Sequence, residues 1–175
     1  MPLPPDQLDG RFGEAWAGEV PNGSHINLAV GRRGSPTAAA AAAAMTTMAP
    51  GHAPFICCLG AGYAVRPITI VRNKATAIEE GLALVTWGAA QLGIGRGVMD
   101  AVDAGLFDRA ALDEVVLLVA VWVDPAAHDH TAVQRANREA MRVAIEDALS
   151  EDRSARVAEL LARRETGRNA FYRGD

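Results

Sequence analysis

A histidine that shares one face of a predicted strand with an asparagine is the first feature of this sequence that suggests acid–base chemistry. In the segment "SHINLAVG" (24–31), aliphatic residues alternate with His25 and Asn27. Such alternation predicts a strand whose aliphatic residues face a core, while His25 and Asn27 share the opposite face. A neutral imidazole can give or take a proton near pH 7, as general acid–base catalysis requires. A structural histidine at a strand edge or in a subunit contact is the alternative.

Three further polar residues stand where a ligand can approach. Lys74 and Thr76 follow the β-branched segment "PITIVRN" (67–73) two residues apart, so both side chains can face one pocket, as a cation and a hydroxyl. Gln91 lies among small residues in "WGAAQLG", where its amide can both donate and accept hydrogen bonds. A solvated loop for Lys74 and Thr76, and a subunit contact for Gln91, are the structural alternatives.

Motifs for metal, phosphate or nucleophilic chemistry are missing from the sequence. His128 and His130 flank Asp129, but this spacing matches no strong zinc pattern and suits a solvated helix start better. The "GIGRG" segment (93–97) lacks the third glycine of the dinucleotide fingerprint and follows a predicted helix rather than a strand. A nucleophile elbow, a phosphate loop and a CxxC motif are also missing. We therefore predict a site without a metal.

Composition and charge restrict the partners and the compartment. The net charge of −4 and the pI of about 5.6 provide no basic field for a nucleic acid. Cys57 and Cys58 are adjacent, which argues against a disulfide between them and fits a reducing cytoplasm. The N-terminus lacks the basic start and apolar run of a signal peptide, and no apolar run reaches the roughly 18 to 20 residues of a membrane span. We expect a soluble, cytoplasmic protein with no membrane partner.

Periodicity and turn signals predict the elements that position these residues. A Pro-Asn-Gly turn at 21–23 joins two strands into a hairpin, and the seven alanines at 38–44 behind Pro36 predict a helix. The predicted elements are strands at 12–20 and 24–31, a helix at 37–48, strands at 55–59 and 67–73, a helix at 76–104, a strand at 114–123 and a helix at 131–149. This order predicts an α+β fold, a two-layer sandwich with one mixed β-sheet and helices packed on it.

The chain of 175 residues fits one domain. We predict an irregular segment at 1–12, a folded domain at 13–150 and a charged, partly helical tail at 151–175. Half of the residues are hydrophobic but only 5% are aromatic, which predicts a core of small aliphatic side chains. Three glycines at 93, 95 and 97 predict either a break in their helix or close packing against a neighbour. The continuous apolar strand at 114–123 should be covered on both faces.

Taken in this order, the segments resemble the formaldehyde-activating enzyme family, the 5,6,7,8-tetrahydromethanopterin hydro-lyases. The segment "SHINLAVGRRGSP" (24–36) is similar to the family's histidine-containing strand followed by D-L-x-x-G-P-R-G-S-P. "VRNKAT" (71–76) is similar to F-N-K-V-T, and "WGAAQ" (87–91) to F-G-P-A-Q. The resemblance covers about 13–149, most of the chain, and needs no gap before Gln91.

The resemblance implies a reaction in which formaldehyde condenses with tetrahydromethanopterin, or a related reduced pterin, to a methylene derivative with loss of water. The pterin is then a co-substrate, and no cofactor is bound permanently. The fold should resemble ribosomal-protein S-five domain two, assembled as a homopentamer with the site between neighbouring subunits. His25 would be the proton donor, and the "GRRGSP" loop (31–36) would shape the pocket edge. The substrate-binding residues would be Asn27, Ile56, Lys74, Thr76 and Gln91.

The chain departs from the family pattern at several places. Asn27 stands in place of an aspartate, Arg32 in place of a proline, and "VWVDPA" (121–126) in place of a histidine-tryptophan pair. If the site requires a carboxylate at position 27, an Asn27→Asp change increases the rate; the alternative is that the Asn27 carbonyl serves the same donor. Two other functions remain open: a non-catalytic module that binds a pterin-like or aldehyde-adduct ligand, and a purely structural oligomer.

Overall fold

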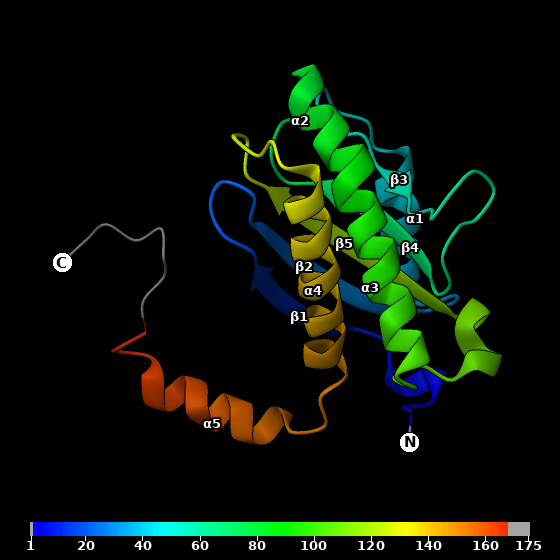
Figure 1. The fold of residues 1–175 in the computed structure, drawn as a ribbon. Coiled ribbons are helices and arrows are strands. Elements are labelled where there is room, and N and C mark those ends of the chain that lie inside the picture. The colour runs from blue at the N-terminus through cyan, green and yellow to red at the C-terminus, as the bar shows by residue number, and fades with distance from the viewer. Residues whose placement is uncertain (1, 168–175) are drawn as a thin grey trace.

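The fold is one five-stranded mixed sheet with helices on both faces, in a computed structural model that describes residues 2–167 (Figure 1). The strands are β1 (Arg11–Ala17), β2 (Ser24–Arg32), β3 (Phe55–Ile56), β4 (Ile68–Asn73) and β5 (Val115–Val123). The helices are η1 (Pro5–Gln7), α1 (Pro36–Thr46), α2 (Glu80–Leu84), η2 (Val85–Ala90), α3 (Gln91–Asp103), η3 (Arg109–Glu114), α4 (His130–Leu149) and α5 (Arg153–Arg163). The predicted α+β sandwich is confirmed.

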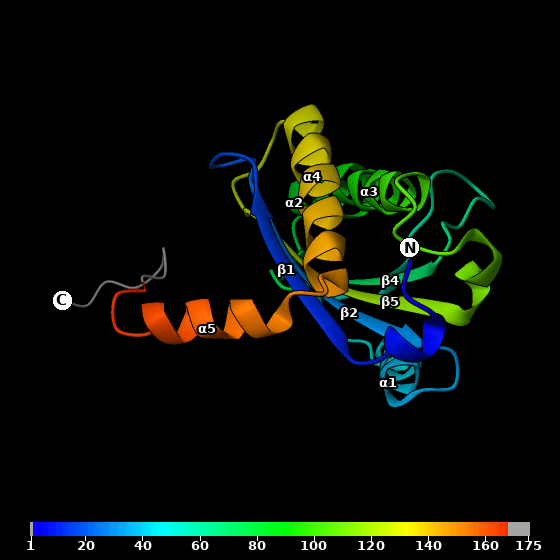
Figure 2. The same cartoon turned by 90° about the horizontal axis from the view of Figure 1, so that it is seen from below.

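The sheet order is β1-β2-β5-β4-β3, in which β4 and β5 are parallel and the other pairs are antiparallel. The predicted hairpin is present as β1 and β2. The helices α3 and α4 cover one face of the sheet, whereas the shorter α1 lies against the other (Figure 2). On β5, every second residue is buried under α3 and α4, and the intervening residues are only partly covered. The predicted cover on both faces of this strand is thus complete on one face and partial on the other.

Small residues allow α4 to lie directly on β1. A side chain at Gly13 would place its Cβ 1.9 Å from the Ala144 carbonyl oxygen. Gly13 therefore permits this approach, and the buried Ala140, Ala144 and Ala148 supply the matching face of α4. The predicted small-residue core is confirmed at this contact.

The glycines of the long helix serve packing rather than a break. Segments α2, η2 and α3 follow one another without interruption from residue 80 to 103, with η2 wound as a π-helix. A Cβ at Gly93 would lie 2.3 Å from the Gln134 carbonyl oxygen, and one at Gly97 would lie 2.6 Å from that of Arg138. Of the two predicted possibilities, close packing is confirmed.

Several predicted elements are shorter in the structure. The strand predicted at 55–59 pairs only over Phe55 and Ile56, after which Cys58 forms an isolated bridge with Ala64. The helix predicted from residue 76 begins at Glu80. The tail contains α5, which projects away from the body beyond β1 (Figures 1 and 2). Within the described residues, none of the helices combines the length and apolarity that crossing a membrane requires.

Candidate functional site

His25 lies on the sheet face opposite α3 and α4, in a row of aromatic side chains. The register places His25 beside Trp16 of β1 and Trp122 of β5. The ring centroids of Trp16 and His25 are 5.5 Å apart, and those of the stacked Trp16 and Trp122 are 5.2 Å apart. These three residues and Lys74 line a cavity of about 260 Å³. The predicted strand face of His25 thus forms the wall of a cavity.

Four side chains around this cavity form one hydrogen-bonded chain. His25 Nε2 lies 2.6 Å from Glu14 Oε1, and His25 Nδ1 lies 2.8 Å from Lys74 Nζ. Lys74 Nζ also donates to Asn27 Oδ1 at 2.8 Å. The structure therefore brings together three of the sequence-predicted residues, His25, Asn27 and Lys74, and adds Glu14.

The Lys74 ammonium determines where the protons lie along these hydrogen-bonded side chains. A charged Lys74 ammonium can only donate, so its neighbours must present acceptors. His25 Nδ1 then carries a lone pair, and the ring proton lies on Nε2, from which it is donated to the Glu14 carboxylate. The Asn27 side chain must turn its carbonyl oxygen, not its NH₂ group, toward Lys74. Both ring nitrogens of His25 thus already have protein partners.

Burial makes the proton of Lys74 easier to remove. Desolvation lowers the pKa of Lys74 below its ordinary value, and the negative charge of Glu14 opposes this effect without cancelling it. Lys74 is also the only lysine of the chain. A cation with a lowered pKa, bonded to an imidazole, can pass a proton to it.

Thr76 is not part of the hydrogen-bonded chain that includes His25 and Lys74. Its hydrogen-bond partner is His52. Its hydroxyl is 3.0 Å from Nε2 of His52, while Nδ1 of the same ring is 2.9 Å from the Asn73 carbonyl oxygen. The Thr76 side chain is exposed to solvent. Lys74 and Thr76 thus follow the same strand, as the sequence predicts, but within one chain the structure gives them separate hydrogen-bonding partners.

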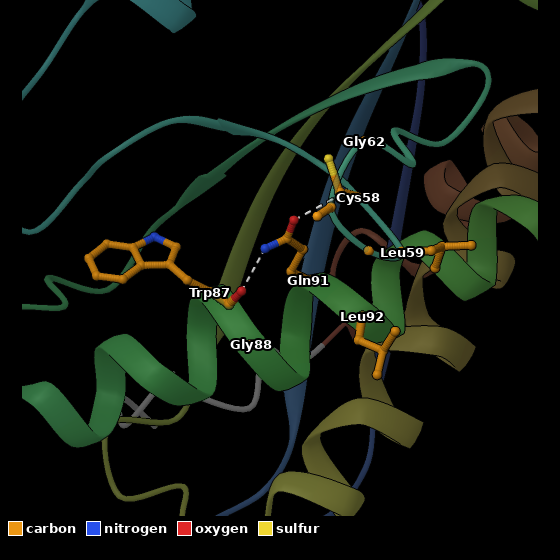
Figure 3. A pocket seen from close by; sticks show the side chains of 9 residues that line it. Cys58, Leu59, Gly62, Trp87, Gly88, Gln91 and Leu92 are labelled. Carbon is orange, nitrogen blue, oxygen red and sulfur yellow. Dashed lines mark hydrogen bonds between the residues drawn. The ribbon is translucent and has the colours of Figure 1, made fainter.

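Gln91 lies at the start of α3 (Figure 3), the helix that covers the sheet face opposite that of His25 (Figure 2). Its Nε2 donates to the Trp87 carbonyl at 2.6 Å, and its Oε1 accepts from the Cys58 backbone N–H at 3.0 Å. The Gln91 backbone N–H donates to the carbonyls of Thr86, five residues back as in a π-helix, and of Gly88. In an α-helix the Trp87 carbonyl would accept from the Gln91 backbone N–H. Here it accepts from the Gln91 side chain instead.

A second cavity of about 400 Å³ opens beside Gln91 (Figure 3). Its lining includes Trp87 and the loop from Cys58 to Gly62. Ile56 lies close by in sequence, on β3, where it faces the same side of the sheet as His25. Two strands, β5 and β4, lie between the strands of His25 and Ile56 in the sheet order. Within one chain, Ile56 and Gln91 thus lie apart from the cavity of His25.

The "GRRGSP" loop lies at the opposite end of β2 from His25. At about 3.3 Å per residue, the seven steps from His25 to Arg32 span roughly 23 Å. The loop is organised for helix initiation, because Ser35 caps α1 by accepting from Ala38 N, and Asp9 accepts from Arg32 N. Hydrogen bonding from Ser35 also lowers the pKa of Asp9. The prediction that this loop shapes the edge of the His25 cavity was wrong for a single chain.

Sequence reasoning missed Glu14, which bonds His25, and Trp16 and Trp122, which line the His25 cavity. The signal for the first two was present, because the alternation in "FGEAWA" (12–17) places Glu14 and Trp16 on one face. Pairing that face with His25 required the register of the hairpin, which its turn decides.

The histidines near the start of α4 have structural surroundings. Asp129 caps α4 by accepting from the backbone N–H groups of Thr131 and Ala132. The Asn22 side chain accepts from the N–H groups of His128 and Asp129. Over residues 2–167, no group of three or more potential ligands among His, Cys, Asp and Glu gathers in a way that could hold a metal ion.

Comparison with known proteins points to one family. The family model described as "Formaldehyde-activating enzyme (Fae)" matches residues 12–172. A 5,6,7,8-tetrahydromethanopterin hydro-lyase of Methanosarcina barkeri is 31% identical over 164 residues, covering 94% of this chain and 91% of the relative. A bifunctional enzyme Fae/Hps of Methanosphaera stadtmanae is 32% identical over 156 residues, or 89% of this chain. The match spans only 38% of that relative's length, and 35% of the Fae/Hps enzyme of Methanothrix thermoacetophila.

Proposed function

Because the chain belongs to the formaldehyde-activating enzyme family, we propose that it condenses formaldehyde with tetrahydromethanopterin, or a related reduced pterin, to the methylene derivative. The observation that carries this proposal is the hydrogen-bonded chain of Glu14, His25 and Lys74 at a cavity lined by two indoles. The reaction needs a general acid that regains its proton after each turnover. His25, hydrogen-bonded to Lys74, can act as this acid.

The reaction moves two protons from nitrogen to oxygen. One pterin nitrogen adds to the aldehyde carbon, and its proton passes to the oxygen, which gives a carbinolamine. The hydroxyl then takes a second proton and leaves as water. The other pterin nitrogen closes on the carbon and releases its own proton. An enzyme accelerates these steps by holding both reactants in register and by supplying and recovering the second proton.

His25 supplies that proton from Nε2. In the absence of substrate this N–H group points at Glu14, whose side chain is 59% exposed and can be displaced by the carbinolamine hydroxyl. As Nε2 gives up its proton, Lys74 passes one to Nδ1, so the imidazole stays neutral throughout. The proton released by the second pterin nitrogen returns along the same route. Glu14 then holds the ring in place between turnovers.

The other residues bind the substrate. The stacked Trp16 and Trp122 offer a flat apolar wall to a pterin ring. Asn27 holds Lys74 through its carbonyl oxygen, which is the acceptor that a carboxylate would provide. Ile56, Thr76 and Gln91 complete the set of proposed substrate contacts.

A second subunit would bring these contacts to one place. Within one chain Ile56 and Gln91 lie apart from His25, and the face that carries His25 leaves Phe12 65%, Trp16 43% and Ile56 41% exposed. Large exposed apolar side chains on one face are typical of protein–protein contacts. These exposed side chains support an assembly, and from the family resemblance we propose that it is a homopentamer whose active sites combine residues of two neighbours. Light scattering should give a mass five times the 18.4 kDa of one chain, and a monomer at micromolar concentration would contradict the shared site.

We also propose that the reaction takes place in the cytoplasm. Cys57 and Cys58 are both free thiols, as a reducing compartment allows. Cys57 is buried, and burial raises its pKa to about 12, so it is unreactive as a nucleophile. Cys57 is therefore not a candidate nucleophile for the reaction.

The proposed function is tested by the rate of methylene formation from formaldehyde and tetrahydromethanopterin, since this condensation also proceeds slowly without a catalyst. We expect a rate well above the uncatalysed one that increases linearly with protein concentration. Tetrahydrofolate in place of tetrahydromethanopterin tests which pterin is accepted. Background rates with both pterins would refute the function, provided that the protein is folded by circular dichroism.

A further inference from the structure

We propose that His52 is a positioning residue that commits the Thr76 hydroxyl to accepting a hydrogen bond from the substrate. This inference rests on the proposed function only in that Thr76 contacts the substrate. The hydrogen-bond polarity itself follows from the geometry around His52. The His52 ring bridges the Asn73 carbonyl oxygen, 2.9 Å from Nδ1, and the Thr76 hydroxyl, 3.0 Å from Nε2.

The contact of His52 with the Asn73 carbonyl determines which group donates in the contact of His52 with Thr76. A backbone carbonyl can only accept, so the proton of the neutral His52 ring must lie on Nδ1. Nε2 then carries a lone pair and accepts the Thr76 hydroxyl proton. Because a hydroxyl has a single proton, Thr76 has none left for a ligand. The two lone pairs of its oxygen can only accept, so Thr76 selects a ligand group that donates.

The surroundings hold Thr76 in this orientation. Gly51 has a φ of +72°, and a Cβ built on it would lie 2.6 Å from Thr76 Cγ2, so the glycine backbone packs directly against the Thr76 methyl group. The Gly51 carbonyl accepts from Asn73 Nδ2 at 2.6 Å and from Ala77 N at 2.9 Å. The segment that carries His52 is thus tied to both sides of Thr76. A methyl contact and a hydroxyl contact together fix the rotamer.

The consequence is a preference for ligands with an N–H group at this position. Thr76 is exposed, so its oxygen is accessible to a ligand. A reduced pterin carries ring N–H and amino groups that can donate to the Thr76 oxygen. An analogue with an unprotonated ring nitrogen or a carbonyl at this position would place one acceptor against another. Without His52 the hydroxyl can rotate and donate instead, so the preference should be lost.

A double-mutant cycle on binding tests this role. Equilibrium binding of tetrahydromethanopterin is measured without formaldehyde, by tryptophan fluorescence, for His52→Phe, Thr76→Val and the double variant. We expect His52→Phe to raise Kd about 3- to 10-fold, the range for one net hydrogen bond. In the Thr76→Val background the same change should have no further effect, because His52 acts only through the hydroxyl. Additive effects of the two changes would overturn the inference.

Two controls separate this role from a general effect on folding. Thr76→Ser retains the hydroxyl and should retain the dependence on His52, whereas His130→Phe alters an exposed histidine at the start of α4 and should leave Kd unchanged. Nitrogen-15 NMR well above the ordinary histidine titration range should show the proton of His52 on Nδ1. A proton on Nε2 would refute the polarity even if the enzyme is active. If the His52 proton lies on Nδ1 but the protein does not bind the pterin, the proposed function is refuted. The inferred preference of Thr76 for a ligand N–H group is then refuted with it.

Discussion

Replacing His25 with alanine is expected to lower turnover by about 10²- to 10⁴-fold, the usual contribution of a general acid or base. The variant loses the imidazole that bonds Lys74 through Nδ1 and carries the proposed acidic proton on Nε2. The effect should fall on kcat, because a general acid acts in the proton-transfer step, whereas Trp16 and Trp122 would still offer their wall to the pterin. Turnover is measured with formaldehyde and tetrahydromethanopterin at saturating concentrations of both.

A matched variant controls for the loss of a histidine as such. His130→Ala alters an exposed histidine on α4, whose first turn lies on the other layer of the fold, and should retain full activity. Equilibrium pterin binding should be nearly the same for His25→Ala and the unmodified protein. A His25→Ala enzyme within about twofold of the unmodified rate would remove His25 from the mechanism, because general acid catalysis predicts a far larger loss.

Local patterns in the sequence were sufficient to predict most of the fold and one side of the site. Alternation in 24–31 identified both the strand and the face of His25, because a period of two leaves only two possible faces. The spacing of Lys74 and Thr76 placed both beyond the end of β4. These predictions depend on neighbours in sequence, which a periodicity can report.

The partners of these residues could not be predicted, because they come from distant segments. Lys74 lies 49 positions from His25, and their contact depends on β4 reaching β2 through β5 in the sheet order. Glu14 required the exact register of the hairpin. The π-helical winding of η2 turns the Gln91 side chain back to its own helix, and no composition signal marks that segment. The role of His52 depends on a loop contact with Thr76 that no periodicity describes.

Replacing Lys74 with methionine is expected to lower turnover by about 10²-fold or more, because the imidazole of His25 loses its source of a second proton. Lys74→Arg separates charge from proton transfer. Arginine keeps a positive charge but does not release a proton in this pH range. We expect Lys74→Arg to be nearly as inactive as Lys74→Met. Full activity of Lys74→Arg would show that the site needs a fixed cation rather than a proton donor.

The pH dependence of turnover gives a second test of Lys74, with a defined sign. Burial lowers the pKa of Lys74 from its ordinary value of 10.5, so the protonated form is lost at a lower pH than for a lysine in water. If the reaction needs that proton, turnover falls on the alkaline side as pH rises through the lowered pKa. In Asn27→Asp a carboxylate replaces the amide oxygen 2.8 Å from Nζ, which raises the pKa of Lys74.

The alkaline limb should therefore lie at higher pH in Asn27→Asp than in the unmodified protein. Near neutral pH the two rates should agree within about tenfold, because the Asn27 carbonyl already accepts from Lys74 and the two acceptors differ by about 1 kcal/mol. Since Lys74 is the only lysine, NMR of a labelled lysine side chain reports its titration in both proteins without overlap. Alkaline limbs at the same pH, despite a shifted lysine titration, would show that the proton of Lys74 is not used in turnover.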